Sequence, residues 1–312
     1  MSTVEVVLTA ICQGAEATDE DPKSLKEAQQ RHDWPKWKEA INAELSQLKS
    51  MGTWEMTKLP HGRTAIGNRW VFARKYNKDG SVAKYKARLV AKGYSQIPGM
   101  DFTDTFSPVV RLETIRAIFA LAVSEDWEIR QMDVKGAYLN GTLSEEIYMR
   151  QPQGFEDYTD LVCLLIKTLY GLKQAGREWN REFDRKIRGL GFRRLFTDTC
   201  VYIRIKDRCL EIITVWVDDL VLFAESKSTA DQLEVEIGLL FETTRLGEPS
   251  KIVGIEITRD REKGTLKISQ ERYTESILEK YGMADANSVT TPMDPKVKLA
   301  PTEDSKEGDR SN

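Results

Sequence analysis

Two consecutive aspartates interrupt an otherwise apolar stretch in the second half of the chain. Asp218 and Asp219 lie within residues 210–224, and a buried pair of like charges is costly unless something neutralises it. Another acid, Asp133, lies at the end of a short predicted strand at 129–134. Each of these acids alone is adequately explained as a turn or capping residue, because Asp favours such positions. Together they fit neighbouring strands that bring three carboxylates to one point, where hard oxygen ligands suit Mg²⁺.

Such a metal site would allow phosphoryl transfer. Two ions about 3.5–4 Å apart activate the attacking hydroxyl and stabilise the leaving oxygen, so the protein mainly supplies positioning and charge neutralisation. The chain has only two histidines, His32 and His61, which argues against histidine-rich zinc sites and against Ser-His or Cys-His nucleophiles. A different metal-dependent phosphotransferase is a more distant alternative, disfavoured because the sequence has no P-loop.

The basic residues are concentrated in two blocks, although the formal net charge is −3. Residues 61–96 contain nine Lys and Arg against one acid, and residues 167–194 contain nine against three. Local charge steers a polyanion more than net charge does. A single charge run is usually a solvated face, but two blocks on either side of one candidate site favour contacts with phosphates.

The hydrophobic pattern predicts the elements that would position these residues. A helix should begin after its cap Asp33, contain Pro35 in its first turn, and end at Gly52. Two alternating stretches, 69–76 and 84–91, predict a β-hairpin with one basic face. The remaining predicted elements are helices at 114–123, 172–190, 231–241 and 271–281, strands at 129–134, 200–205 and 210–224, and a hairpin at 252–269. This mixture predicts an α+β fold with an antiparallel sheet.

The ends of the chain and its cysteines carry less information. We interpret residues 1–32 as a leader or linker and expect the polar tail, 296–312, to be disordered. The four cysteines show no CxxC spacing and no signal peptide precedes them, which predicts reduced thiols in an intracellular protein. No apolar run is long enough to cross a bilayer, so we expect no membrane partner.

A series of ordered motifs gives the chain a close resemblance to a known family. They lie between about residues 21 and 295 and comprise WKEA at 37–40, GTW at 52–54, KARLVAKGY at 86–94, MDVKGAYLNG at 132–141, LYGLKQA at 169–175, VDDL at 217–220, GIEI at 254–257 and TP at 291–292. These stretches resemble the reverse transcriptases of copia-type long-terminal-repeat retrotransposons. In that family the region lies between integrase and RNase H in a Pol polyprotein, and the acidic clusters of both neighbours are missing here.

The resemblance implies a right-hand polymerase fold for a reverse transcriptase domain of residues 33–295. Its parts would be fingers at about 60–110 and 140–190, palm at about 111–139 and 191–250, and primer grip with a partial thumb at about 251–295. The implied activity is RNA-directed DNA polymerisation, the transfer of dNMP to a primer 3′-hydroxyl with two Mg²⁺ or Mn²⁺ ions. Its partners would be an RNA or DNA template-primer and dNTPs, in a cytoplasmic virus-like particle or in the nucleus.

The resemblance also implies which residues hold the metal ions. Asp133 and Asp218 would be the main ligands, with Asp219 in support. Val134 would offer its backbone carbonyl.

Five further residues are implied in nucleotide binding. Arg88, with Lys86 as the weaker candidate, would meet the triphosphate, because Arg forms strong charge-assisted contacts with phosphate oxygens. Tyr138 would be an aromatic gate that excludes a ribose 2′-hydroxyl, with packing in the palm as its alternative. Lys173 and Gln174 would lie under the template base and the nucleotide.

On the primer side, the resemblance points to Trp216 and Gly254. Gly254 would belong to the primer grip, where a missing side chain lets backbone approach the strand, and Trp216 would touch the primer end. The family usually has Tyr at position 216, Pro at 176 and Asp at 245, whereas this chain has Trp216, Gly176 and Arg245. These departures keep open the alternative of a decayed or domesticated copy that binds nucleic acid without catalysis.

Overall fold

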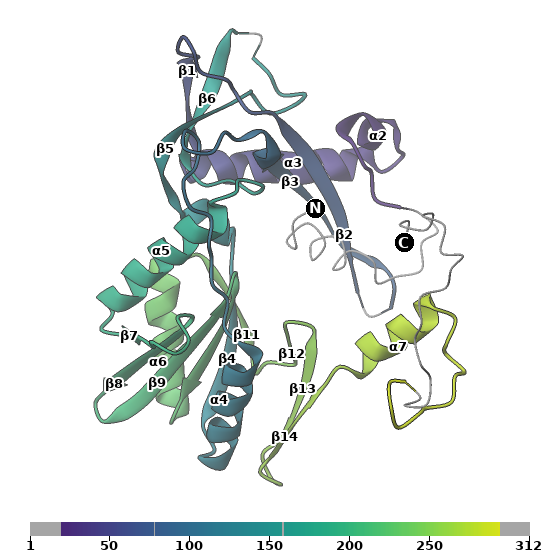
Figure 1. Ribbon diagram of the computed structural model, residues 1–312, viewed down its shortest axis with the longest axis vertical. Coiled ribbons are helices and arrows are strands. Elements are labelled where there is room, and N and C mark those ends of the chain that lie inside the picture. The colour runs from purple at the N-terminus through teal and green to yellow at the C-terminus, as the bar shows by residue number, and fades with distance from the viewer. Residues whose placement is uncertain (1–19, 78, 158, 294–312) are drawn as a thin grey trace, which may run out of the picture. The chain divides into compact units, whose positions relative to one another are not determined.

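The structure is a computed structural model that describes residues 20–77, 79–157 and 159–293. The chain divides into two compact units, Met1–Ser269 and Gln270–Asn312. The predicted site residues all belong to the first unit, whose described part consists of antiparallel sheets covered by helices (Figure 1). The predicted tail, and residues 1–19 of the predicted leader, lie outside the described residues.

A two-stranded hairpin carries the first basic block. It is formed by β2 (Asn68–Tyr76) and β3 (Val82–Ala91), and it packs on helix α3 (Trp34–Ser50). Since side chains alternate along a strand, one face presents Phe72 to the fully buried Trp37 of α3, with ring centroids 5.3 Å apart. The other face carries Lys86 and Arg88. The predicted hairpin with one basic face is confirmed.

The same core includes elements that the hydrophobic pattern did not predict. They are α2 (Leu25–Gln30) and a sheet in the order β1-β6-β5, formed by Trp54–Lys58, Leu161–Lys167 and Thr142–Met149. Helix α2 lies in the predicted leader, yet it buries Leu25 and Ala28. Ser24 caps it by accepting a hydrogen bond from the Glu27 amide at 3.2 Å. A six-residue helix is too short to show the periodicity on which the prediction depended.

A six-stranded antiparallel sheet forms the second core. Its order is β11 (Thr243–Gly247), β4 (Glu128–Val134), β10 (Asp219–Ala224), β9 (Cys209–Trp216), β8 (Val201–Lys206) and β7 (Arg193–Arg194). Four consecutive residues of β10, Leu220 to Phe223, are buried, so both faces of this central strand are covered. The predicted α+β class with an antiparallel sheet is therefore confirmed.

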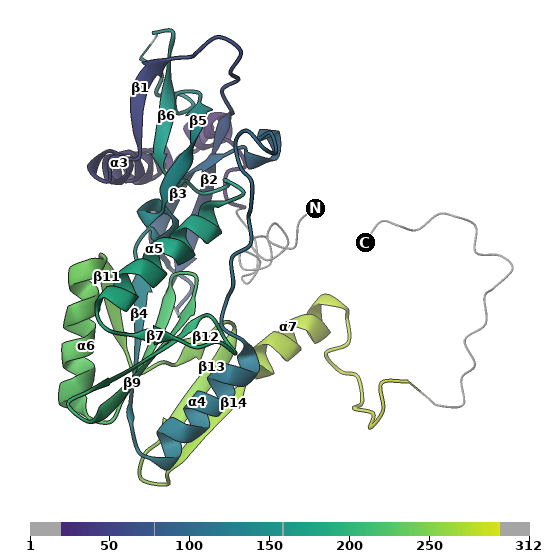
Figure 2. The same ribbon diagram turned by 60° about the vertical axis from the view of Figure 1, so that its left-hand side comes forward.

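Helices cover the two faces of this sheet. On one face, Phe119 of α4 (Leu112–Ser124) meets Phe223 of β10 edge to face. On the other, Phe183 of α5 (Ala175–Gly189) meets Tyr202 of β8. Arg204, two residues further along β8 on that face, pairs with Glu236 of α6 (Lys227–Leu240) at 2.7 Å. Helices α5 and α6 therefore share a face opposite α4 (Figure 2).

A three-stranded sheet beside α4 completes the first unit. It contains β12 (Lys251–Ile252), β13 (Ile255–Asp260) and β14 (Thr265–Ser269), in that order. Residues Val253 and Gly254 form the tight turn between β12 and β13, both with positive φ, 48° and 75°. In the second unit, α7 (Glu271–Lys280) has only exposed and half-buried residues.

Two further expectations can be compared with the structure. Cys163, Cys200 and Cys209 are free thiols, and burial raises the pKa of both Cys163 and Cys200 to about 12; Cys12 lies outside the described residues. In the part of the chain that the structure describes, no helix has the length and apolar character needed to cross a membrane.

Candidate active site

A tight turn between β9 and β10 presents Asp218. Trp216 and Asp219 are register partners, so Val217 and Asp218 form the two-residue loop. Val217 has a φ of 55°, an unusual conformation for a β-branched residue. Two hydrogen bonds hold the loop: the indole NH of Trp179 donates to the Val217 carbonyl at 2.7 Å, and the Val134 amide donates to the Asp218 carbonyl at 2.8 Å. The turn is thereby fixed to α5 and to β4.

Strand register places Asp133 directly opposite Asp219. The two are partners in the antiparallel pairing of β4 with β10, and directly opposed residues of such strands have Cα atoms about 4.5–5.5 Å apart with side chains on one face. Asp218 follows in the adjoining turn. Three acids that are far apart in the sequence are thus neighbours at one end of the central strand.

The electrostatics of this cluster favour a cation. Burial, followed by the nearby Asp218, raises the pKa of Asp219 to about 6, although a hydrogen bond from Gln131 opposes the shift. Burial also raises the pKa of Asp218, as does the charge of Asp133, while Arg88 and Lys86 act in the opposite direction. Carboxylates that raise one another's pKa lose this repulsion when a positive charge lies between them.

The carboxylates of Asp133, Asp218 and Asp219 are suitable ligands for divalent metal ions, and the strand register brings them close together. Carboxylate oxygens are the ligands that Mg²⁺ prefers, and the mutual repulsion of these three would be relieved by it. Within residues 20–293, apart from 78 and 158, the side chains of His, Cys, Asp and Glu nevertheless form no group of three arranged to hold a metal ion. Metal binding would therefore require the aspartate side chains to rotate toward one another, with the strand register unchanged.

The basic face of the β2–β3 hairpin lies within electrostatic reach of the carboxylates. Burial, then the charges of Arg88 and Lys75, lower the pKa of Lys86 to about 8, while Asp133 opposes this shift. The Arg88 guanidinium lies 5.1 Å from the centroid of the Tyr170 ring. Its buried Nε has no hydrogen-bond partner among the described residues. Two cations that are distant in sequence thus act electrostatically on the acidic cluster.

Tyr138 lies where the two cores meet. It is half-buried, packs against both hydrophobic clusters and contacts Tyr170 edge to face, with ring centroids 5.6 Å apart. Burial, and then the charge of Asp218, raise the pKa of its hydroxyl. A Cβ added at Gly176 would lie 3.0 Å from the Ser107 Cβ and 3.8 Å from the Tyr138 ring. The absence of a side chain at position 176 therefore leaves room beside Tyr138.

Lys173 and Gln174 differ in what they can offer a ligand. Gln174 is completely buried; its amide donates to the Asp101 carbonyl at 2.7 Å and accepts from Gln96 at 3.0 Å. Its side chain therefore supports the loop around Gln96 and is not exposed to a nucleotide. Lys173 is exposed, and its ammonium lies 5.0 Å from the Phe102 ring centroid.

The two residues predicted to meet the primer lie in different sheets, Trp216 at the end of β9 and Gly254 between β12 and β13. Trp216 is half-buried against the second core, and its register partner is Asp219. Gly254 lies in the tight turn after β12, with open space where a Cβ would be. Arg245 on β11 lies 3.6 Å from the buried Glu234 of α6. Of the three departures from the family pattern, only Trp216 is a direct partner of a candidate ligand.

Sequence reasoning overlooked Gln131 and Tyr170. Gln131 donates to the Asp219 carboxylate at 3.2 Å, and Tyr170 lies between Arg88 and Tyr138. Position 131 precedes Asp133 by two residues, which places both side chains on one face of β4. That spacing was the available signal for Gln131, and for Tyr170 it was the LYGLKQA motif at 169–175.

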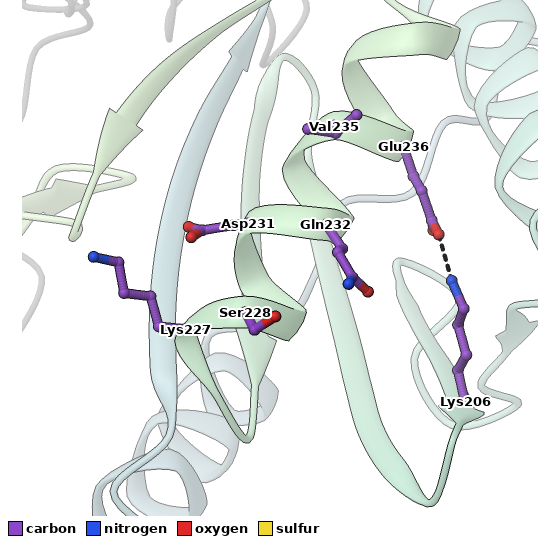
Figure 3. A pocket seen from close by; sticks show the side chains of 7 residues that line it. All are labelled: Lys206, Lys227, Ser228, Asp231, Gln232, Val235 and Glu236. Carbon is purple, nitrogen blue, oxygen red and sulfur yellow. Dashed lines mark hydrogen bonds and ion pairs between the residues drawn. The ribbon is translucent and has the colours of Figure 1, made fainter.

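Two grooves in the described part of the first unit lie away from the three aspartates. One of about 640 Å³ is lined by seven residues of α6 and the end of β8: Lys206, Lys227, Ser228, Asp231, Gln232, Val235 and Glu236 (Figure 3). Lys206 and Glu236 pair across it at 2.6 Å. Another, of about 310 Å³, is lined by residues 64–67, 92, 94, 95, 97, 101 and 150. Neither contains a candidate metal ligand, so the chemistry of the carboxylates, not cavity size, marks the candidate site.

Comparison with known proteins identifies the class to which this fold and site belong. Residues 51–295 match the family described as "Reverse transcriptase (RNA-dependent DNA polymerase)". This match covers most of the chain, so the protein belongs to that family.

Among individual proteins, the chain is most informatively compared with transposon polyproteins. It is 39% identical over 285 residues to the "Retrovirus-related Pol polyprotein from transposon TNT 1-94" of Nicotiana tabacum, covering 90% of this chain and 22% of that protein. Identity to the corresponding polyprotein from transposon RE1 of Arabidopsis thaliana is 38% over 268 residues, covering 85% and 18%. For the "Transposon Ty1-MR1 Gag-Pol polyprotein" of Saccharomyces cerevisiae the identity is 29% over 274 residues, covering 84% and 14%.

These matches confirm the predicted resemblance to copia-type reverse transcriptases. The chain spans only about a fifth of the length of these relatives.

Proposed function

We propose that this chain is an RNA-directed DNA polymerase that transfers dNMP from a dNTP to a primer 3′-hydroxyl. The observation that carries the proposal is the register of Asp133 with Asp219, with Asp218 in the adjoining turn. Membership of the reverse transcriptase family supports it. The substrates would be dNTPs and an RNA or DNA template-primer, and the parent protein would be a longer Pol polyprotein.

The three aspartates, with the Val134 carbonyl, would hold two Mg²⁺ or Mn²⁺ ions. When bound, such ions supply activation of the primer hydroxyl and charge neutralisation at the leaving pyrophosphate. The strands keep the carboxylates in place, since β10 is the buried centre of the sheet. Because the chain's own contribution is to orient oxygens and charges, no catalytic histidine is needed.

The residues on the hairpin would bind the triphosphate. Arg88 is the stronger candidate, because its guanidinium is always charged and its buried Nε lacks a hydrogen-bond partner within the described residues. Lys86, whose pKa lies near 8, would add charge only when protonated. Tyr138 would exclude a ribose 2′-hydroxyl from its place at the junction of the cores. Lys173 would remain available to the template side, whereas Gln174 would act through the loop that it supports.

We further propose a right-hand arrangement of fingers, palm, primer grip and partial thumb. The family resemblance implies fingers at about 60–110 and 140–190 and palm at about 111–139 and 191–250. Because helix α5 packs in the core of the six-stranded sheet, we propose to move residues 175–190 from the fingers to the palm. The primer grip would include Gly254, with Trp216 beside the primer end, and α7 would belong to the thumb.

Primer extension on an RNA template with Mg²⁺ or Mn²⁺ tests the proposal. Wild-type protein should extend the primer, and Asp218→Asn and Asp133→Asn should each lower the rate by at least about a hundredfold, because each removes a metal ligand. Asp231→Asn, an acid on α6 in the groove of Figure 3, is the matched control and should retain the rate. Absence of extension in the wild type, or extension equal to it by Asp218→Asn, would refute polymerase activity.

A second candidate is a decayed or domesticated copy that binds nucleic acid without catalysis. Trp216 favours this candidate, since it is the register partner of Asp219 and is bulkier than the Tyr usual in the family. This candidate predicts salt-dependent template-primer binding that weakens when Arg88 and Lys92 are replaced, with no turnover. If Trp216→Tyr gains extension that the parent lacks, Trp216 is the position that impairs the parent chain.

A further inference from the structure

The Gln131 side chain joins the acidic cluster to the neighbouring small sheet. Its amide nitrogen donates to the Asp219 carboxylate at 3.2 Å and to the Lys251 backbone carbonyl at 3.2 Å. Gln131 itself is buried, with 7% of its surface exposed. It lies two residues before Asp133 on β4, so its side chain is on the same face of the sheet as those of Asp133 and Asp219. One side chain therefore bridges a candidate metal ligand and strand β12.

The chemistry of the two partners fixes the orientation of this amide. A carboxylate oxygen and a backbone carbonyl oxygen both accept hydrogen bonds and cannot donate them. Only the NH₂ group of Gln131, which has two donors, satisfies both; the reverse orientation would place its carbonyl against two acceptors. No other uncharged side chain of this length offers two donors from one atom, so the bridge depends on glutamine.

The bridge ends two residues before the turn that contains Gly254. Lys251 and Ile252 form β12, and Val253 and Gly254 make the tight turn into β13. Ile252 is buried, and Val253 packs against the core of the six-stranded sheet. A short strand followed by a two-residue turn has little freedom to move once its first residue is held. A shift at Gln131 would therefore shift the turn.

A second attachment holds the far end of the same small sheet. Arg259 donates to the Trp127 carbonyl at 2.7 Å, and Arg261 donates to Glu128 at 2.6 Å and to Asp126 at 3.0 Å. These contacts lie at or just before the start of β4, whereas Gln131 lies in the middle of the strand. The small sheet is thus fixed to β4 at two points, and only the Gln131 contact includes a candidate metal ligand.

We propose that Gln131 is a positioning residue that holds the Val253–Gly254 turn in register with the carboxylate of Asp219. The inference rests on the proposed function, in which that turn supports the primer strand and Asp219 supports the metal ions. Gln131 would then set the distance between the primer end and the metal site without touching either substrate. Its loss would misplace the reacting hydroxyl while leaving the binding surfaces intact.

The first test compares Gln131→Met with the wild type in primer extension. Methionine keeps the length of the side chain but removes both donors. We expect kcat to fall by about ten- to a hundredfold, because misplacement by about 1 Å has costs of that order. The KM values for dNTP and template-primer should change by less than about threefold, since neither binding surface is altered. A loss of kcat and affinity together, with a lowered Tm, would mean that Gln131 only stabilises the fold.

The matched control is Arg261→Gln, which loosens the same small sheet at its other attachment. It should keep kcat within about twofold of the wild type, because the contact to Asp219 is untouched. If Arg261→Gln lowers kcat as much as Gln131→Met does, the effect belongs to the sheet as a whole and the proposal is wrong.

Hydrogen exchange provides a readout that does not need catalysis. Amides 251–255 should exchange faster in Gln131→Met than in the wild type or in Arg261→Gln. Adding Mn²⁺ should slow their exchange in the wild type and the control, but not in Gln131→Met. Equal exchange of these amides in all three proteins overturns the inference even if the wild type extends primers. If the wild type extends nothing while the exchange difference is present, the proposed function fails and the bridge remains.

Discussion

At the scale of single residues, Asp219 is held in a state that costs the fold free energy. Burial and Asp218 raise its pKa to about 6, so the folded protein favours its protonated form. The resulting loss of folding free energy is absent at pH values below 3.8, the ordinary pKa of Asp. It grows as the pH rises from there through about 6. The metal-free protein therefore carries its largest penalty at neutral and alkaline pH.

We predict that Asp219→Asn stabilises the metal-free protein at pH 8 and not at pH 4. The Tm should rise by about 2 °C at pH 8, a small gain because Asp219 is only partly buried and solvent screens its charge. Thermal unfolding in EDTA at both pH values checks this. Mg²⁺ should raise the Tm of the wild type more than that of Asp219→Asn; an equal Tm difference between variant and wild type at both pH values would contradict the account.

A second prediction concerns the basic residue Lys86 and the pH dependence of the KM for dNTP. Burial, Arg88 and Lys75 lower its pKa to about 8, so it is charged below that pH and neutral above it. If it meets the triphosphate, the KM for dNTP should rise as the pH increases from 7 to 9. In Lys86→Arg this rise should be reduced by about half or more, because guanidinium stays protonated. Steady-state extension across this pH range is the measurement, and identical pH profiles would exclude Lys86 from the nucleotide site.

At the scale of elements, the strained β9–β10 turn is the feature most open to test. Val217 adopts a φ of 55°, which costs a β-branched residue of the order of 1 kcal/mol. We predict that Val217→Asn raises the free energy of unfolding by about 0.5–1 kcal/mol, because Asn tolerates this conformation. Urea unfolding measures the change.

Val253→Asn is the companion variant for this prediction. Val253 has a φ of 48° in the turn of the small sheet, so the Val253→Asn variant should also have a higher free energy of unfolding. A loss of stability in both variants would mean that the packing of the valine side chains outweighs backbone strain.

The sequence predicted the elements whose pattern is local. Strand β4, the β2–β3 hairpin and helices α3 to α7 each have a periodicity or a turn signal within a short window. The sheet β1-β6-β5 was missed because its pairing is not local: Trp54 pairs with Leu165, more than a hundred residues away. Charged residues in β5 further hide its alternation.

The same distinction explains what was predicted of the candidate site. Asp218 and Asp219 are visible as acids in an apolar run and Asp133 as an acid at a predicted strand end, and the resemblance to a family assigns them roles. The bridging contacts of Gln131 depend on which strands are neighbours, which one sequence does not reveal. Gln174 follows a motif, but whether its amide faces a ligand or the loop at Gln96 depends on packing that the motif does not encode.

At the scale of the whole molecule, the two units differ in how much they bury. Both hydrophobic cores lie in the first unit, while α7 in the second has only exposed and half-buried residues. We predict that a protein ending at Ser269 unfolds with a Tm within about 2 °C of the full chain, because the described part of the removed segment, residues 270–293, contains no buried residue. Calorimetry of both proteins checks this. A much lower Tm for the shorter protein would show that residues 270–312 stabilise the first unit.

The register of β4 with β10 has a consequence for how the site can fail. Because side chains alternate along a strand, a slip of one residue would turn Asp133 to the other face of the sheet. The spacing of the carboxylates is therefore a discrete quantity, set by an integer number of residues and protected by the buried centre of the sheet. A substitution that changes this register should therefore abolish the site, whereas gradual tuning of activity must come from loops and side chains, such as Gln131, that leave the register unchanged.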